Sequence, residues 1–479
     1  MILGAHHGLS LNDFGTERKA QVGSAASRVN LPELQAAFEG RVIAPGDPDF
    51  ERARTVVYGD IDRRPAAIVR VADADDVGRL VDLARETGVE LAVRSGGHSI
   101  AGHSVTEGGI VLDLRDMKSL DIDIEGRTAW AATGLTAAEF SAAVGAHGLA
   151  VGFGDTGSVG IGGIALGGGV GFLVRKHGLT IDSLLAAEVV TADGELVFTD
   201  AGNHPDLFWA IRGGGGNFGV ATRLKFRLHE VPSIVGGMLF LPASAEIVTG
   251  FMAAAESAPE ELSGIANVMV APPLPFLPAE LEGRLIVMAF LVYAGETEAG
   301  ERALAPFRDL APPIMDMIRP MPYHEIFPPE DDSYHPTAVS QTMFVDAIDD
   351  EVAETIIRYL ESSDAPLRVA QLRTLGGAMA RVPVDETAFA HRQSRIMVNV
   401  AAFYEGADDR PRREAWVSDF AGALRQSDTG AYVGFLGDDG RERIRAAYPG
   451  ATWDRLVEVK SRYDPTNLFR LNQNVPPAS

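Results

Sequence analysis

Apolar residues recur at two different spacings near the start of the chain, and they predict alternating strands and helices. Short apolar runs at 66–71, 91–93 and 109–114 predict buried strands. Between the first two runs, apolar residues at helical spacing over 77–84 follow Asp73, which can cap a helix. This order predicts a strand–helix–strand unit.

Two β-hairpins are predicted further along. Residues 119–132 alternate in places and turn at 125–126. The apolar runs 187–191 and 196–198 flank the pair Asp193-Gly194, a strong hairpin signal. The other elements predicted before residue 230 are two helices and a strand: 136–147, 204–210 and 220–228.

Around residue 230 the character of the chain changes. Strands predicted at 284–293 and 395–404 alternate with helices predicted at 350–361 and 411–426. This pattern predicts a second α+β domain with an antiparallel sheet. A chain of 479 residues is also too long for one hydrophobic core, so at least two domains are expected.

Composition and charge exclude several kinds of function. The net charge is −24, so nucleic acid and anionic lipid would repel the protein. No cysteine is present, which excludes disulfides, thiolate nucleophiles, Fe–S clusters and cysteine-ligated zinc. The 11 histidines have no metal-ligand spacing, so no metal site is expected. We see neither a secretory signal nor an apolar run of about 18–20 residues for a membrane span, and we expect a cytoplasmic protein.

A loop with small residues around one imidazole lies between two predicted strands. It reads Arg94-Ser95-Gly96-Gly97-His98-Ser99 and continues to His103. Glycine lets the backbone adopt positive φ and brings its N–H groups within reach of a phosphate. The simpler interpretation is a tight loop whose histidine bonds a backbone carbonyl.

A second stretch is richer in glycine. Ten of the eighteen residues in 152–163 and 166–171 are glycine, which weakens any regular element and indicates close approach of something to the backbone. A long anionic cofactor held through its pyrophosphate fits this composition. A Rossmann site is the alternative, because 160–165 matches G-x-G-x-x-A with Asp182 about twenty residues on. That segment does not follow an apolar strand, so we disfavour it.

Four motifs in order resemble one enzyme family. They are the Gly96-Gly97-His98 loop, 159–163 with 167–171, 207–220, and 463–474. Together they resemble the FAD-linked oxidases of the vanillyl-alcohol-oxidase superfamily, and within it the berberine-bridge-enzyme-like branch. The resemblance implies an α+β fold in which a two-subdomain PCMH-type FAD-binding domain carries an inserted substrate domain with an antiparallel sheet and helices. The implied segments are an N-terminal arm (1–29), the FAD domain (30–231), the substrate domain (232–439) and a C-terminal segment returning to the FAD domain (440–479).

The resemblance also implies how FAD is held. His98 would carry a covalent bond to the flavin, with His103 as a chemical competitor. Many relatives add a second link through a cysteine where this chain has Thr156, so FAD here would be linked once, by histidine. Val159 aligns with a position that governs oxygen access in plant members, where valine goes with oxidases and leucine with dehydrogenases; the alternative is a packing residue. The implied cofactor-binding residues are Arg94, Ser95, Gly96, Gly97, His98, Ser99, His103, Gly154, Asp155, Thr156, Val159, Gly160, Gly162, Gly163, Gly167, Gly168, Gly169, Gly219, Val220, Asn472 and Asn474.

The substrate site is less well defined. Sugar oxidases of the family place a tyrosine base where this chain has Phe435, which leaves Tyr432 as a candidate. Asn399, Gln371 and Tyr448 are further candidates, each with the alternative of an ordinary sheet or surface residue.

The implied reaction is hydride transfer from a C–H of a small alcohol or amine to flavin N5, with O2 as acceptor and H2O2 as product. The alternatives are a flavin dehydrogenase with another acceptor and a flavin-binding protein without turnover. We expect a monomer or homodimer.

Overall fold

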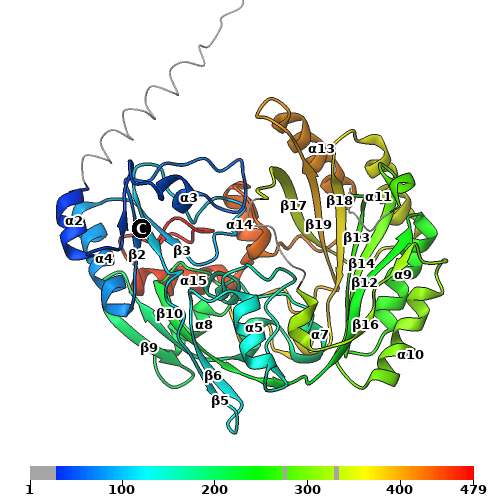
Figure 1. Ribbon diagram of the computed structural model, residues 1–479, viewed down its shortest axis with the longest axis horizontal. Helices are drawn as coiled ribbons and strands as arrows, with labels where there is room; N and C mark the ends of the chain where they lie inside the picture. The colour runs from blue at the N-terminus through cyan, green and yellow to red at the C-terminus, as the bar shows by residue number, and fades with distance from the viewer. Residues whose placement is uncertain (1–28, 273–277, 328–333, 479) are drawn as a thin grey trace, which may run out of the picture.

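The computed structural model describes residues 29–272, 278–327 and 334–478. The N-terminal arm predicted over 1–29 lies outside this part of the chain except for Val29. Within it, three large sheets and their helices form two bodies (Figure 1). The first two sheets form one body, called here the two-sheet body, and the third sheet with its helices forms the other. This mixture of helices and sheets confirms the α+β class. Across these described ranges, no helix has both the length and the apolar character needed to cross a membrane.

The first sheet contains the predicted strand–helix–strand unit. Its strands are β1 (Val42–Ile43), β2 (Ala67–Arg70), β3 (Leu91–Arg94) and β4 (Ile110–Asp113). Helix α2 (Leu31–Ala37) precedes β1, α3 (Phe50–Arg54) lies between β1 and β2, and α4 (Ala74–Thr87) lies between β2 and β3. The strand order is β1-β2-β4-β3, with β4 parallel to both neighbours. As predicted, Asp73 caps α4 by accepting the N–H of Asp76 at 2.9 Å, and Gly88 ends it at a φ of 65°.

The second sheet is antiparallel and includes both predicted hairpins. Its strands, in spatial order, are β5 (Leu120–Asp123), β6 (Thr128–Ala132), β10 (Val220–Arg227), β8 (Leu184–Val190) and β9 (Leu196–Asp200). Helix α5 (Ala137–Gly145) begins with a capping box between Thr136 and Glu139. The rings of Phe140, Phe153 and Phe226 pack edge to face under this helix, with centroids 5.0–5.7 Å apart. The shorter elements are β7 (Leu149–Ala150), α6 (Ile161–Leu166), α7 (Val174–His177), η1 (Thr180–Ser183), α8 (Pro205–Ile211) and β11 (His229–Glu230).

The third sheet is built entirely from residues 234–403. Along its main path the strands are β15 (Met315–Asp316), β12 (Ile234–Pro242), β14 (Leu285–Tyr293), β13 (Leu262–Val270), β18 (Arg368–Thr374), β19 (Ile396–Phe403) and β17 (Ala338–Val345), with β16 (Arg319–Met321) beside β12. All of its pairings are antiparallel, as predicted.

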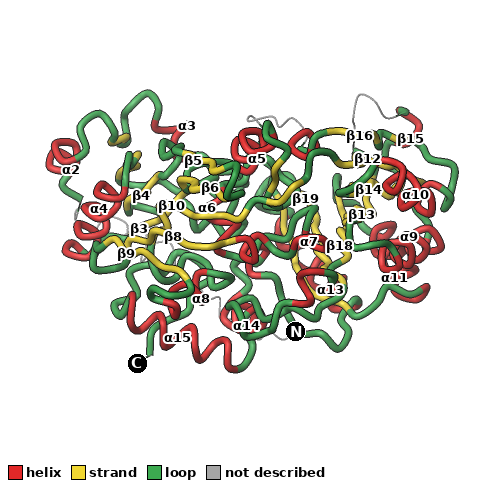
Figure 2. The backbone as a smooth tube through the Cα atoms, turned by 90° about the horizontal axis from the view of Figure 1, so that it is seen from below, coloured by secondary structure: helices red, strands yellow, loops and turns green. Residues whose placement is uncertain are grey.

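Four helices cover one face of this third sheet. They are α9 (Ala245–Ser257), α10 (Thr297–Arg308), α11 (Asp350–Ser362) and α13 (Arg410–Ala423). Their apolar residues share one core with alternate residues of the strands, such as Val398 and Val400 of β19. Figures 1 and 2 show α9, α10 and α11 on the outer side of the sheet, so its other face is turned toward the first two sheets. The other elements described between residues 232 and 439 are η2 (Ala279–Leu281), η3 (Tyr323–Ile326), α12 (Ala378–Arg381) and η4 (Val433–Phe435).

The C-terminal segment returns to the two-sheet body. It holds α14 (Gly440–Ala447) and α15 (Ala451–Tyr463), and α15 packs against α8. Lys460 of α15 is fully buried, and its Nζ donates to Asp464 Oδ2 at 2.6 Å and to the carbonyls of Asn217 and Phe469 at 2.8 and 3.0 Å. One cation therefore joins the helix, the chain after it and the glycine-rich stretch at 213–219.

Candidate active site

Two glycine-rich loops lie in backbone contact with each other. The first (residues 95–99) follows β3, and the second (residues 152–160) precedes α6. A Cβ on Gly96 would overlap the backbone nitrogen of Gly160, and a Cβ on Gly160 would overlap Ser95. Glycine is required at both positions because the two backbones leave no room for a side chain.

The imidazole of His98 lies against the second loop. Its Nε2 is 2.8 Å from Ser158 Oγ, and the side chain is half-buried. At the start of the first loop, the guanidinium of Arg94 turns inward and donates to Asp113 Oδ2 at 2.8 Å, with both residues buried. The ion pair fixes the strand end from which the loop leaves, so Arg94 supports the loop from the interior.

His103 lies in the continuation of the first loop. Its backbone N–H donates to Ser99 Oγ at 3.2 Å, and its buried Nε2 has no hydrogen-bond partner among the described residues. Burial, assisted by the charge of Arg63, lowers the pKa of His103 to about 4. The ring is therefore neutral near pH 7.

The second loop presents a carboxylate beside a hydroxyl. Thr156 Oγ1 donates to Asp155 Oδ1 at 3.2 Å, and Asp155 Oδ2 accepts from Arg373 Nη2 at 2.5 Å. Val159 is only partly buried and packs at the edge of the core that contains Phe153. The packing interpretation of Val159 is thus compatible with the structure.

The glycine-rich stretch forms a helix that its composition did not predict. Gly160 is the N-cap of α6, and Ile161 and Ala165 are fully buried, so packing of these side chains overrides the low helix propensity. Gly162 lies against Thr133, whereas a Cβ on Gly163 would meet nothing within 4 Å. Gly163 therefore offers an open backbone surface.

The following glycines contact Tyr432. Gly168 and Gly169 have φ values of 123° and 76°, which favour glycine, while Gly167 is not crowded. The N–H of Gly169 donates to Tyr432 Oη at 3.1 Å. This bond connects the glycine stretch to η4.

The third glycine stretch and the C-terminal segment form another open surface. Gly219 has a φ of 155° and lies tight against Val190, directly before Val220 starts β10. Cβ atoms on Gly215 and Gly216 would meet nothing within 4 Å. Asn472 Nδ2 donates to the carbonyl of Gly216 at 3.2 Å.

These surfaces fit a long cofactor with many polar atoms. The buried Oδ1 atoms of Asn472 and Asn474 have no partner in the described part of the chain. Buried polar atoms without partners are costly, and a bound ligand would satisfy them. Glycines 163, 215 and 216 leave room for its approach. Among the described residues, no group of three or more His, Asp or Glu side chains could hold a metal ion.

A polar row crosses the third sheet on the face away from its helices. Asn267, Gln371, Asn399 and Thr342 lie side by side on β13, β18, β19 and β17. Because Val398 and Val400 belong to the helix-side core, alternation places Asn399 on the opposite face. Gln371 Nε2 donates to Asn267 Oδ1 at 2.9 Å, and Asn399 Oδ1 has no partner among the described residues. The register of β18 and β19 thus makes the two candidates Gln371 and Asn399 neighbours.

The two candidate tyrosines are buried and hydrogen-bonded. Tyr432 accepts from the N–H of Gly169, and burial raises its pKa. Tyr448 donates to the carbonyl of Gly213 at 3.3 Å, within the core of the two-sheet body, and burial raises its pKa as well. Neither phenol is therefore poised to take a proton at neutral pH. The ring of Phe435 packs edge-on to that of Tyr432, with the ring centroids 5.2 Å apart.

Two residues of this region were not predicted from the sequence. Arg373 lies two residues after Gln371 and therefore on the same face of β18, and Asn267 lies opposite Gln371. The spacing of two could have indicated Arg373, since both residues are polar in an apolar strand. Nothing in the sequence indicated the pairing with Asn267.

A cleft of about 1000 Å³ opens beside the first loop. Ile100 and Ala101 line it on one side, and Ser340 and Gln341 of β17 line it on the other. Because β17 is the last strand of its sheet, the cleft runs along a sheet edge.

Comparison with known proteins gives two family matches and full-length relatives. Residues 65–200 match the model for an FAD binding domain, and residues 431–476 match the model "Berberine and berberine like". The chain is 30% identical over 461 residues to (R)-6-hydroxynicotine oxidase of Paenarthrobacter nicotinovorans, covering 92% of this chain and 97% of the relative.

Solved structures with similar folds cover the same length. Crystalline 6-hydroxy-D-nicotine oxidase from Arthrobacter nicotinovorans has a TM-score of 0.81 at 28% identity, covering 92% of this chain and 98% of the other. BBE-like 28 from Arabidopsis thaliana has a TM-score of 0.78 at 26% identity, covering 91% and 98%. The similarity therefore extends through both bodies of the fold.

Proposed function

Because this chain belongs to the FAD-linked oxidoreductases of the berberine-bridge-enzyme-like family, we propose that it is an oxidase whose FAD is attached once, through His98. It takes hydride from a C–H bond of a small alcohol or amine and uses O2 as the acceptor, giving H2O2. The enzyme class and the use of FAD follow from the relatives. The single link and the product are the proposal.

The placement of His98 is the observation that carries the proposal. Its Nε2 contacts Ser158 Oγ, so the ring is oriented between the two loops that resemble the family's flavin loops. A neutral imidazole can act as a nucleophile toward the 8α-carbon of a flavin. With no cysteine in the chain, a second link to the flavin, through a thioether, is impossible.

Bound FAD supplies the hydride acceptor, and the protein supplies orientation. We assign orientation of the substrate to Asn399, whose Oδ1 accepts no hydrogen bond from the described residues, and to Gln371 beside it. An alcohol would need a base, but the pKa values of Tyr432 and Tyr448 are raised and Asp155 is paired with Arg373. These observations favour an amine, which can release hydride from its neutral form without such a base.

The attachment is tested by fluorescence of the denatured protein band under ultraviolet light. We expect flavin fluorescence in the wild type and in His103→Ala, and none in His98→Ala. His103→Ala is the matched control, since it removes an imidazole from the same loop. Fluorescence that survives in His98→Ala would overturn the assignment.

The reaction is tested by peroxide release under air from a panel of amines and alcohols. Bleaching of the flavin without peroxide would instead indicate a dehydrogenase with another acceptor. Absence of bleaching by any compound would support a flavin-binding protein without turnover. Turnover of sugars with no turnover of amines would overturn the preference for an amine.

A further inference from the structure

The guanidinium of Arg373 is buried, and each of its three nitrogen atoms donates a hydrogen bond. The residue is 4% exposed. Nη2 donates to Asp155 Oδ2 at 2.5 Å, Nε and Nη2 donate to Gln371 Oε1 at 3.0 and 2.8 Å, and Nη1 donates to the carbonyl of Val170 at 3.3 Å. The group also lies over the ring of Phe435, 5.1 Å from its centroid.

These partners come from four separate parts of the chain. Asp155 belongs to the second glycine-rich loop, and Val170 directly follows the glycines at 167–169. Phe435 belongs to η4, while Gln371 and Arg373 itself belong to β18 of the third sheet. One cation thus connects the two bodies of the fold where the predicted flavin loops face the polar row.

The bonds are also directional. Gln371 Oε1 accepts from Arg373, which leaves its Nε2 for Asn267 Oδ1, so the amide has one orientation. Asp155 is oriented by Arg373 on one oxygen and by Thr156 on the other. A change at Arg373 would therefore release both the loop and the polar row.

We propose that the Asp155–Arg373 ion pair is a clamp that fixes the 152–160 loop, and with it the flavin, against the substrate-facing side of the third sheet. Thr156, bonded to Asp155, stands where a covalent tether occurs in many family members, so the clamp holds noncovalently what those proteins tether. Arg373 acts as a positioning residue. The statement about flavin rests on the proposed function, whereas the loop-to-sheet connection does not.

The clamp predicts a spectroscopic effect that needs no knowledge of the substrate. Sulfite adds to oxidised flavin and places a negative charge on it, so a displaced ring or a lost cation weakens the adduct. In holoenzyme carrying Arg373→Gln we expect the sulfite dissociation constant to rise at least tenfold and the visible circular dichroism of the flavin to change. Arg373→Lys keeps the charge and should restore part of both signals.

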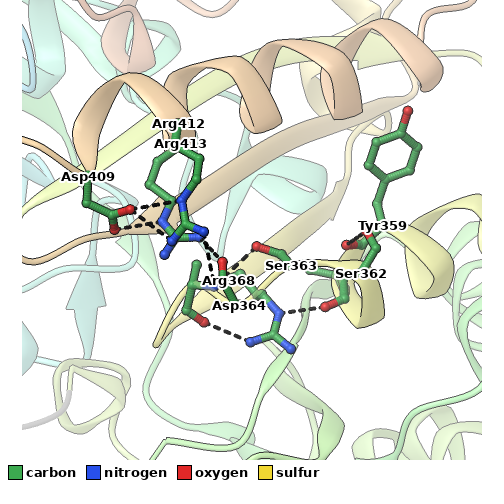
Figure 3. A network of polar contacts seen from close by, with 10 residues as sticks. Tyr359, Ser362, Ser363, Asp364, Arg368, Asp409, Arg412 and Arg413 are labelled. Carbon is green, nitrogen blue, oxygen red and sulfur yellow. Dashed lines mark hydrogen bonds and ion pairs between the residues drawn. The ribbon is translucent and has the colours of Figure 1, made fainter.

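Arg413 provides the matched control. Its side chain is 5% exposed, like that of Arg373, and it donates to Asp364 and Asp409, but it lies on helix α13 (Figure 3). Arg413→Gln should lower the melting temperature without changing sulfite affinity or the flavin spectrum. Equal spectral changes in the Arg413 and Arg373 variants would overturn the clamp.

A double-mutant cycle on thermal unfolding separates this proposal from the oxidase assignment. Asp155→Asn, Arg373→Gln and the double variant are compared in whatever flavin state the protein is isolated. If the wild type is isolated without flavin and the two substitutions are still coupled, the clamp is supported although the covalent flavin is not. If their shifts in melting temperature are additive, the clamp is overturned, even when the wild type carries flavin. If Arg373→Gln does not fold, Asp155→Asn alone must reproduce the loss of sulfite affinity, and an unchanged affinity overturns the proposal.

Discussion

Replacing Lys460 by methionine tests how the C-terminal segment is attached. The side chain is fully buried, and its ammonium bonds Asp464 and the carbonyls of Asn217 and Phe469. Methionine fills a similar volume but cannot donate a hydrogen bond. The substitution leaves the buried carboxylate of Asp464 without its counter-ion.

The loss of stability follows from the unpaired carboxylate of Asp464. Removing one partner of a buried ion pair costs about 3–5 kcal/mol, because the remaining charge stays desolvated. Asp464 keeps two backbone donors, the N–H groups of Leu468 and Phe469 at 2.8 and 2.9 Å, which places the loss nearer the lower figure. At roughly 2–4 °C per kcal/mol for a domain of this size, the melting temperature should fall by about 10 °C.

Calorimetry of purified protein measures the shift. Lys118→Met is the control, because the Lys118–Glu139 pair is exposed and should contribute less than about 1 kcal/mol. Adding Asp464→Asn to Lys460→Met should recover stability, since it removes the unpaired charge. A loss of less than about 1 kcal/mol in Lys460→Met, or no recovery in the double variant, would refute this reasoning.

Three further predictions concern the loops and one helix. Gly160→Ala should destabilise by about 1–3 kcal/mol or more because its Cβ overlaps Ser95, whereas Gly163→Ala, with open space around it, should leave the melting temperature nearly unchanged. The folded pKa of His103 is about 4 against 6.5, so the unfolded chain binds more protons between these values and the unfolding free energy should fall as pH drops from 6.5 to 4; urea titrations of His103→Leu should show a shallower fall. Thr136→Ala removes the hydroxyl half of the capping box of α5, and chemical denaturation should show a loss of about 1 kcal/mol.

Local patterns in the sequence were sufficient for helix α4 and for the β8–β9 hairpin, whereas the sequence analysis named no element where β12, β13 and α15 lie. Helix α4 has both an apolar face and a capping aspartate, and the β8–β9 hairpin has Asp193-Gly194 at its turn. These signals act over a few residues, so they survive without knowledge of the rest of the chain. Helix α6 was missed because tertiary packing of Ile161 and Ala165 outweighs its glycines.

The candidate site was partly predictable for a related reason. The glycine loops carry their chemistry in contiguous motifs, and Asn399 and Gln371 were candidates from the sequence, although their pairing across β18 and β19 comes from the structure. The Asp155–Arg373 pair joins residues 218 positions apart, and no local pattern indicates such a contact. Neither did the sequence indicate that the pKa values of Tyr432 and Tyr448 are raised, since burial comes from the assembled fold.

The return of the C-terminal segment has a consequence for the order of synthesis. The third sheet uses only residues 234–403, which leave the ribosome as one continuous stretch. The two-sheet body, by contrast, lacks Lys460 and Asn472 until about 240 residues after β10 have been made. The eight-stranded sheet can therefore form during translation, while the glycine surfaces beside Asn472 are completed last. A histidyl–flavin bond that depends on these surfaces would form only after translation has reached the final helix.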